Sequence, residues 1–147
     1  MNFTAKEDYG LRVVLDLATH AGAGPVQARE IAARQAIPEQ FLEQLLAALR
    51  RAEVVRSTRG AAGGYALASD PTKITVGMVL RALSGRLVPQ NLIDGPPEGG
   101  VPAAEELVVR GVWLQMREAI RGVADRTTVA DLLERVESGS SSFMMHI

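Results

Sequence analysis

The stretch of residues 31–67 constrains the fold of this chain more than any other, because three local patterns follow one another in it. A short helical segment leads into a turn, and a longer helix is predicted over residues 38–52. Apolar residues at helical spacing form one face of that helix, and polar or small residues form the other. The apolar face consists of Phe41, Leu42, Leu45, Leu46 and Leu49, and the opposite face of Gln40, Glu43, Gln44, Ala47 and Arg51. This order of elements is typical of a helix-turn-helix.

The residues after this helix predict a β-hairpin. Residues 54–57 suit one strand and residues 65–67 suit the returning strand, so residues 59–64 form the tip. Three glycines in the tip permit positive φ angles and close approach of the backbone to another molecule. A helix-turn-helix followed by such a hairpin is the plan of a winged helix-turn-helix, in which Arg59 leads the tip toward a phosphate backbone or a minor groove.

The polar face of the helix predicted at residues 38–52 has two interpretations. On the second helix of a helix-turn-helix, long amides and a carboxylate can reach base edges in the major groove, where Gln pairs with adenine and Glu accepts from cytosine. The same side chains can also form an ordinary solvated surface. The sequence assigns no base partner to Gln40, Glu43 or Gln44.

A set of residues in and around the hairpin matches a known signature. The residues are Tyr9-Gly10-Leu11-Arg12, Leu42-Glu43-Gln44, Leu49-Arg50, Val55, Ser57, Arg59-Gly60, Gly63-Gly64-Tyr65 and Leu67. With them, the chain resembles the Rrf-type family of bacterial winged-helix regulators, which includes the iron-sulfur cluster regulator, the nitric-oxide-sensing repressor and the cysteine-metabolism repressor. The resemblance extends from residue 1 to about residue 135. It implies a dimeric repressor that binds a double-stranded DNA operator in a sequence-specific way.

The resemblance also implies which residues touch DNA. The recognition helix would read the major groove, the wing tip would enter the flanking minor groove, and basic or hydroxyl side chains would meet phosphates. Tyr9 and Lys6 would contact a phosphate, although half-buried packing is an alternative role for Tyr9 and a solvated charge is the alternative for Lys6. Besides Lys6, the expected contact set is Gln40, Glu43, Gln44, Arg51, Arg56, Ser57, Arg59, Gly60 and Tyr9.

The distribution of charge supports a local nucleic-acid contact. The chain has 16 basic and 17 acidic residues and a formal net charge of −1, which argues against non-specific coating of nucleic acid. Residues 50–60, by contrast, contain four arginines and a single glutamate. A focused basic patch on a near-neutral protein is typical of sequence-selective binding.

Residues 102–125 are predicted to form a long helix. Five of its residues recur at alternating spacings of three and four, namely Val109, Val112, Met116, Ala119 and Val123. This coiled-coil-like seam spans about two heptads, which is too short for a stand-alone coiled coil but sufficient for crossing a symmetry mate. We therefore expect a homodimer that is held together by this helix.

Four regions follow from these patterns. Residues 1–84 form a winged helix-turn-helix DNA-binding domain, and residues 85–104 form a Pro- and Gly-rich loop that is a candidate sensor region. Residues 105–137 form dimerisation helices, and residues 138–147 form a mobile tail. The expected fold class is mainly α with a small β-hairpin wing and a long C-terminal dimerisation helix.

Local signals predict where individual helices begin and end. Thr4 and Glu7 form a capping pattern, so the first helix is predicted from there to about residue 21. Pro38 suits the first position of the longer helix, since its missing N–H would be unsatisfied there. Glu53 stands where the family usually has glycine, so we expect that helix to end less sharply.

Cysteine is absent from the chain. This excludes disulfides and thiolate ligands, whereas cluster-binding members of the family carry three cysteines before the long helix. His20 and His146 show no metal-ligand spacing, so we expect no cofactor. A small molecule near the 85–104 loop, a partner protein, or protein abundance alone would then carry the signal.

Other classes of function have less support in the sequence. The glycine-rich tip lacks the Gly-Lys-Ser/Thr ending of a nucleotide loop, and no nucleophile-base pairing stands out, so we do not expect an enzyme. No secretion leader and no apolar run of membrane-spanning length is visible, so a cytoplasmic location is expected. The remaining alternative is a winged-helix protein-interaction module without DNA binding.

Overall fold

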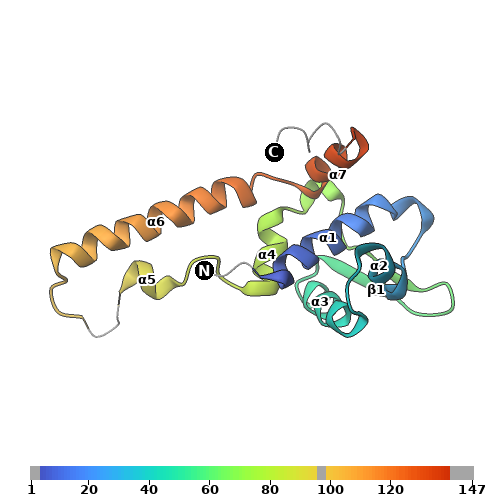
Figure 1. The fold of residues 1–147 in the computed structure, drawn as a ribbon, viewed down its shortest axis with the longest axis horizontal. Helices are drawn as coiled ribbons and strands as arrows, with labels where there is room; N and C mark the ends of the chain where they lie inside the picture. Colours follow the sequence, from blue (N-terminus) through green and yellow to red (C-terminus); the bar gives the residue numbers. More distant parts are fainter. Residues whose placement is uncertain (1–3, 96–98, 140–147) are drawn as a thin grey trace.

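The computed structural model describes residues 4–95 and 99–139 as a helical protein with one β-hairpin (Figure 1). The helices are α1 (Ala5–Thr19), α2 (Ala28–Gln35), α3 (Glu39–Arg51), α4 (Val76–Ser84), α5 (Gln90–Asp94), α6 (Ala104–Ala124) and α7 (Val129–Glu137). The strands are β1 (Val55–Thr58) and β2 (Gly64–Leu67), and short 3-10 turns lie at Ala21–Ala23 and Pro71–Lys73. The expected fold class, mainly α with a hairpin wing and a long C-terminal helix, is confirmed.

The hydrophobic core lies between α1, α2, α3 and α4. The apolar face predicted for α3 supplies four of its buried side chains, and Phe41 lies half-buried at the edge. These side chains pack against others that include Val13, Val14 and Leu17 of α1, Ile31 of α2 and Val79 of α4. Burial of the apolar face fixes the orientation of α3 about its own axis and turns its polar face to solvent.

The long helix α6 extends to one side of this core, with α5 beside it (Figure 1). Its C-terminal end returns to the core, where Ala124 is buried with Leu80 of α4. Directly after it, the backbone of Val129 donates to Ile74 at 2.8 Å and that of Val76 donates to Thr127 at 2.9 Å. The last helix, α7, then packs on α1. One end of α6 is therefore joined to the core by backbone hydrogen bonds.

Two segments differ from the sequence prediction. The first helix was predicted to continue to about residue 21, but α1 ends at Thr19 and a 3-10 turn follows. Residues 85–104 were predicted as a loop, but they include the short helix α5. From residue 140 on, the predicted mobile tail lies outside the described residues.

The end of α3 was expected to be gradual because Glu53 replaces a glycine, and this prediction is wrong. Glu53 adopts the left-handed conformation that glycine usually supplies, with φ of 60°. The amide of Glu53 donates to Arg50 at 3.0 Å, and that of Val54 donates to Leu49 at 3.0 Å. This pair of hydrogen bonds is a Schellman motif, which ends a helix sharply. Glu53 therefore forms the same cap as glycine, with strain from its Cβ.

Glu7 links the start of α1 to the end of α4. Its carboxylate accepts from the amide and hydroxyl of Thr4 at 2.6 and 2.7 Å, which confirms the predicted capping pattern. It also accepts from the hydroxyl of Ser84. Burial by itself would raise the pKa of Glu7, but the hydrogen bonds from Ser84 and Thr4 stabilise the carboxylate and lower its pKa from 4.5 to about 2.

Replacing Glu53 with glycine tests the strain at the end of α3. Glu53→Gly should raise the free energy of unfolding by about 0.5 to 1 kcal/mol, because glycine adopts a positive φ without a Cβ clash. Ala52→Gly is the matched control, since Ala52 has φ of −84° and glycine there should lower stability. Urea denaturation measures both. A loss of stability in Glu53→Gly would contradict the assignment of strain.

The lowered pKa of Glu7 predicts a dependence of stability on pH. A carboxyl whose pKa is lower in the folded state stabilises the fold above its unfolded pKa, and that contribution is lost as pH falls toward the folded value. Glu7→Gln should therefore cost about 1 to 3 kcal/mol near neutral pH, and the difference from wild type should shrink between pH of about 5 and about 2. Chemical denaturation at several pH values checks this, with exposed Glu137→Gln as the control. Parallel pH profiles for wild type and Glu7→Gln would refute the prediction.

Candidate nucleic-acid interface

The helix-turn-helix is formed by α2 and α3. The turn begins at Ala36, which adopts a left-handed conformation with φ of 53°, and the amide of Ile37 closes it by donating to Ala32 at 3.1 Å. Pro38 was predicted as the first residue of α3, but it is the N-cap, and the helix begins one residue later at Glu39. The buried Ile37 side chain fixes this turn on the core. Helix α3 therefore follows α2 after a short, well-defined turn.

A buried carboxylate holds α2 on α1. Asp16 of α1 is only 3% exposed and accepts two hydrogen bonds from the Arg34 guanidinium, both at 2.9 Å. The side-chain amide of Gln35 donates to the same carboxylate at 2.9 Å. Burial would raise the pKa of Asp16, but the hydrogen bonds from Arg34 and Gln35 outweigh burial and lower it. The Arg34 side chain thus reaches back from α2 to α1.

The polar face of α3 is exposed, as its sequence pattern indicated. Gln40, Glu43 and Gln44 all lie at the surface, on the side opposite the buried leucines. Within residues 4–95 and 99–139, none of their side chains makes a hydrogen bond or an ion pair with another residue. They are consequently available to an external partner of matching hydrogen-bonding pattern.

The wing is a short antiparallel hairpin joined to the start of α2. Its register pairs Val55 with Leu67 and Thr58 with Gly64. Beyond the hairpin, Val26 and Tyr65 exchange two backbone hydrogen bonds at 2.8 and 2.7 Å. A Cβ at Gly64 would lie 2.5 Å from the Val26 carbonyl oxygen, so only glycine allows this approach. Gly64 is predicted from sequence to lie in the wing tip, but its close packing on Val26 carries no signal in the local sequence.

The wing tip projects from the molecule with Arg59 and Gly60 exposed. Gly60 has a positive φ of 109°, and its carbonyl accepts from the amide of Gly63 at 2.9 Å. This hydrogen bond closes the tip into a compact turn. Arg59 therefore precedes a hydrogen-bonded turn, and the positive φ that the glycines were expected to permit is adopted at Gly60 and Gly64.

The two neighbouring residues Arg56 and Ser57 point to opposite faces of the hairpin, as strand geometry requires. Ser57 lies toward the end of α3, where Arg50 donates to its hydroxyl at 3.4 Å. Arg56 instead lines a cavity of about 160 Å³ with Leu17 of α1 and Tyr65. The hairpin therefore separates Arg56 from Arg50 and Arg51 at the end of α3, although all three belong to the basic patch predicted at residues 50–60.

Tyr9 lies between α1 and α3. Its ring packs edge-on against Phe41 with centroids 5.6 Å apart, and the Arg12 guanidinium lies 5.1 Å from the ring centre. These contacts leave Tyr9 half-buried, which fits its packing role, and its contact with a phosphate stays a prediction. A groove of about 380 Å³ nearby brings Lys6 of α1 together with Gln44 and Arg51 of α3. This groove places Lys6 beside the polar face of α3, and its contact with a phosphate stays a prediction.

The predicted seam of α6 lies at the surface. Val109, Val112, Met116 and Val123 are between 38% and 69% exposed, and Ala119 is exposed as well. Leu107 and Leu114, on another side of the helix, are also exposed. So much apolar surface on one helix is unusual for a solvated surface.

Metal and membrane binding find no support in the described residues. No group of three or more His, Asp or Glu side chains is placed to hold a metal ion in the part of the chain that the structure covers. No helix between residues 4 and 139, outside the gap at 96–98, is long and apolar enough to cross a membrane.

Comparison with known proteins agrees with this architecture. A family model described as iron-dependent transcriptional regulator, Rrf2, matches residues 3–135. The HTH-type transcriptional regulator CymR of Bacillus subtilis (strain 168) is 35% identical over 147 residues, which is 100% of each chain.

Solved structures show the same similarity. The structure of CymR, the global cysteine regulator of B. subtilis, has a TM-score of 0.76 and 37% identity and covers 91% of this chain and 97% of its own. The structure of T. potens IscR has a TM-score of 0.76 and 38% identity, with 94% and 90% covered. These matches confirm the resemblance seen in the sequence. The chain belongs to the Rrf2 family, whose members are DNA-binding transcriptional regulators.

Proposed function

We propose that this protein is a homodimeric repressor that acts in the cytoplasm on a pseudo-palindromic operator. The observation that carries the proposal is the exposed polar face of α3, where Gln40, Glu43 and Gln44 have no side-chain partner among the described residues, beside a basic wing. Each region expected from the sequence would have its own role. Residues 1–84 would bind DNA, residues 85–104 would receive a signal, and residues 105–137 would support dimerisation, with α6 as the contact helix.

Each predicted DNA contact has a role in this proposal. Gln40, Glu43 and Gln44 would read base edges in the major groove, where amides and carboxylates have matching partners. Arg59 and Gly60 would enter the adjacent minor groove. Phosphate contacts, which position the protein without reading sequence, would come from Arg51, Arg56, Ser57, Tyr9 and Lys6.

Dimerisation would bury the exposed seam of α6 against its copy in a second chain. A two-fold axis through such an interface presents two recognition helices in opposite directions, and the two DNA half-sites then lie about 34 Å apart, or a multiple of that. This geometry accounts for the apolar side chains at Val109, Val112, Met116, Ala119 and Val123, which contribute little to the core of one chain.

The regulatory signal would differ from that of a thiolate-ligated cluster. The family description refers to iron, but a chain without cysteine offers no thiolate to an iron-sulfur cluster. We therefore propose a small-molecule or protein effector. Purified protein with an intense visible absorption and stoichiometric iron would refute this part of the proposal.

Selection of genomic DNA fragments by the purified protein tests the proposed function. The best fragment and a scrambled version are compared at two salt concentrations, because salt sensitivity reports phosphate contacts and the ratio between fragments reports base reading. We expect a strong preference for an inverted repeat. Equal affinity for both fragments at each salt concentration would favour a protein-interaction module instead.

Removing the arginine at the wing tip should weaken operator binding. Arg59→Ala is expected to cost about 1 to 3 kcal/mol of binding free energy and to relax preference at positions flanking the half-sites. Fluorescence anisotropy with operator variants measures both effects. Arg135→Ala, an exposed arginine on α7, is the matched control. Unchanged operator affinity in Arg59→Ala would remove the wing tip from the mechanism.

A charge in the α6 seam should separate the dimer. Val112→Asp would place an unpaired carboxylate in the proposed apolar interface, and burial of such a group is costly. Sedimentation should show a monomer, and the same is expected of Met116→Asp. Val136→Asp changes an exposed valine of α7 and should leave the dimer intact. Val112→Asp and Met116→Asp variants that both remain fully dimeric would place the interface elsewhere.

A further inference from the structure

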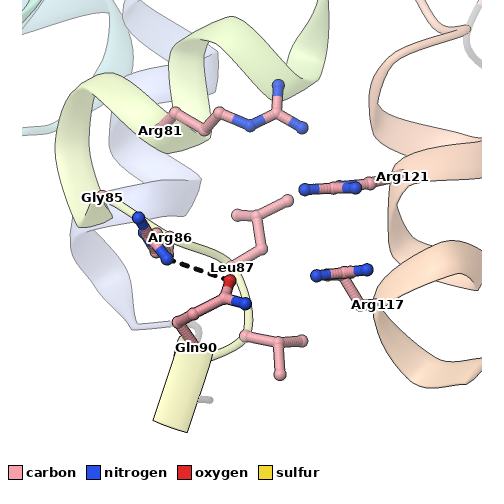
Figure 2. A pocket seen from close by; sticks show the side chains of 8 residues that line it. Arg81, Gly85, Arg86, Leu87, Gln90, Arg117 and Arg121 are labelled. Atoms are coloured by element: carbon pink, nitrogen blue, oxygen red, sulfur yellow. Dashed lines mark hydrogen bonds between the residues drawn. The ribbon is translucent and has the colours of Figure 1, made fainter. Parts of the chain in front are cut away.

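Four arginines surround a cavity between α4 and α6. The cavity has a volume of about 410 Å³ and lies where α4 ends, beside the segment that leads to α5. Arg81 comes from α4, Arg86 from the segment after it, and Arg117 and Arg121 from α6. Figure 2 shows Arg117 and Arg121 extending from α6 toward Leu87, with Arg81 and Arg86 on the other side. No acidic residue lines this cavity in the described part of the chain.

The charges of these arginines are only partly balanced. Arg81 forms two hydrogen bonds with Asp125 at 2.7 and 2.8 Å. Arg117 and Arg121 share Glu118, at the longer distances of 3.3 and 3.5 Å. Four guanidinium groups thus have two carboxylates between them.

Arg86 is the least balanced of the four. It donates to the neutral side-chain oxygen of Gln90 at 2.9 Å, and no ion pair within residues 4–95 and 99–139 includes it. Like charges on two facing elements repel one another, and a bound anion would remove that repulsion. Arginine is also the side chain best suited to carboxylate and phosphate groups, because its planar guanidinium donates two parallel hydrogen bonds.

The cavity combines these charges with an apolar floor. Leu87 and Val88 line it and are buried, and Leu87 packs with Leu80 and Ala124. A second cavity of about 370 Å³, between α5 and α6, is less suited to an anion because Glu105 and Glu106 line it together with Arg110. The excess of positive charge therefore distinguishes the α4–α6 cavity.

We propose that this arginine cavity binds a small polyanion that carries carboxylate or phosphate groups, and that its occupancy regulates DNA binding. The regulatory part rests on the proposed function as a repressor. The ligand joins Arg81 and Arg86, next to the DNA-binding core, to Arg117 and Arg121 on α6. It thereby changes how firmly α6 is held against the core, and with it the relative position of the two recognition helices in a dimer.

Calorimetric titration without DNA tests the site itself. Inorganic pyrophosphate and citrate are titrated separately into the full-length protein at constant ionic strength. We expect saturable binding of one of them, with one site per chain. Arg117→Gln/Arg121→Gln should weaken it at least tenfold. Preference for pyrophosphate or for citrate identifies phosphate or carboxylate as the recognised group.

A matched control separates the site from general charge effects. Lys73→Gln/Arg135→Gln removes the same charge from exposed positions outside the cavity and should leave the affinity unchanged. Circular dichroism verifies that both double variants fold. The proposal is overturned by absence of saturable binding to wild type, or by equal weakening in both variants. It is also overturned if wild type binds neither anion and the Arg117→Gln/Arg121→Gln dimer dissociates, because an acidic group of the second copy would then occupy the cavity.

Operator binding with and without saturating anion tests the regulatory step. At fixed ionic strength, the anion should change the operator affinity of wild type at least fivefold and that of Arg117→Gln/Arg121→Gln by less than twofold. Equal affinity of wild type in both conditions would refute regulation through this cavity. A protein without sequence preference in DNA would refute the proposed function, whereas the calorimetric result would still decide whether the anion site exists.

Discussion

The ion pair between the buried Asp16 and the partly exposed Arg34 is the interaction on which the position of the helix-turn-helix depends. Removing Arg34 would leave the Asp16 carboxylate buried without its charged partner, which is strongly destabilising. The pair also orients α2 on α1. Arg34 donates two parallel hydrogen bonds to the Asp16 carboxylate, and the side chain of Gln35 donates a third. The core leucines supply most of the buried apolar surface. Apolar contacts alone would allow α2 to slide along α1, and the hydrogen bonds to Asp16 oppose this movement.

The wing depends on the same arrangement. Val26, just before α2, pairs with Tyr65 of β2, so the hairpin is aligned by the element that Asp16 holds in place. Helix α3 is oriented by its buried leucines and ends in a Schellman cap that leads directly into β1. The polar face of α3 and the wing tip are therefore positioned by one connected set of contacts, which suits a surface that must match a rigid duplex.

Local signals in the sequence predicted the local structure, but they did not predict the contacts between residues far apart in the chain. The period of the leucines located the two faces of α3, and Thr4 with Glu7 located the start of α1, because both patterns act over one or two helical turns. The pairing of Val26 with Tyr65, the inward turn of Arg34 and the side of the hairpin taken by Arg56 depend on residues far apart in sequence. The prediction of a gradual end to α3 failed at Glu53. The surrounding hydrogen bonds hold this residue at a positive φ, which a residue with a Cβ disfavours.

The attachment of α6 at one end gives it the properties of a lever. Backbone hydrogen bonds at Val76 and Val129 form the fulcrum, and the 21 residues of the helix extend from it by about 32 Å. A rotation of about 5° at the fulcrum would displace the far end by about 3 Å, which is comparable to the rise of one DNA base pair. A very small rearrangement beside the fulcrum is then enough to decide whether two such molecules match the pitch of a double helix.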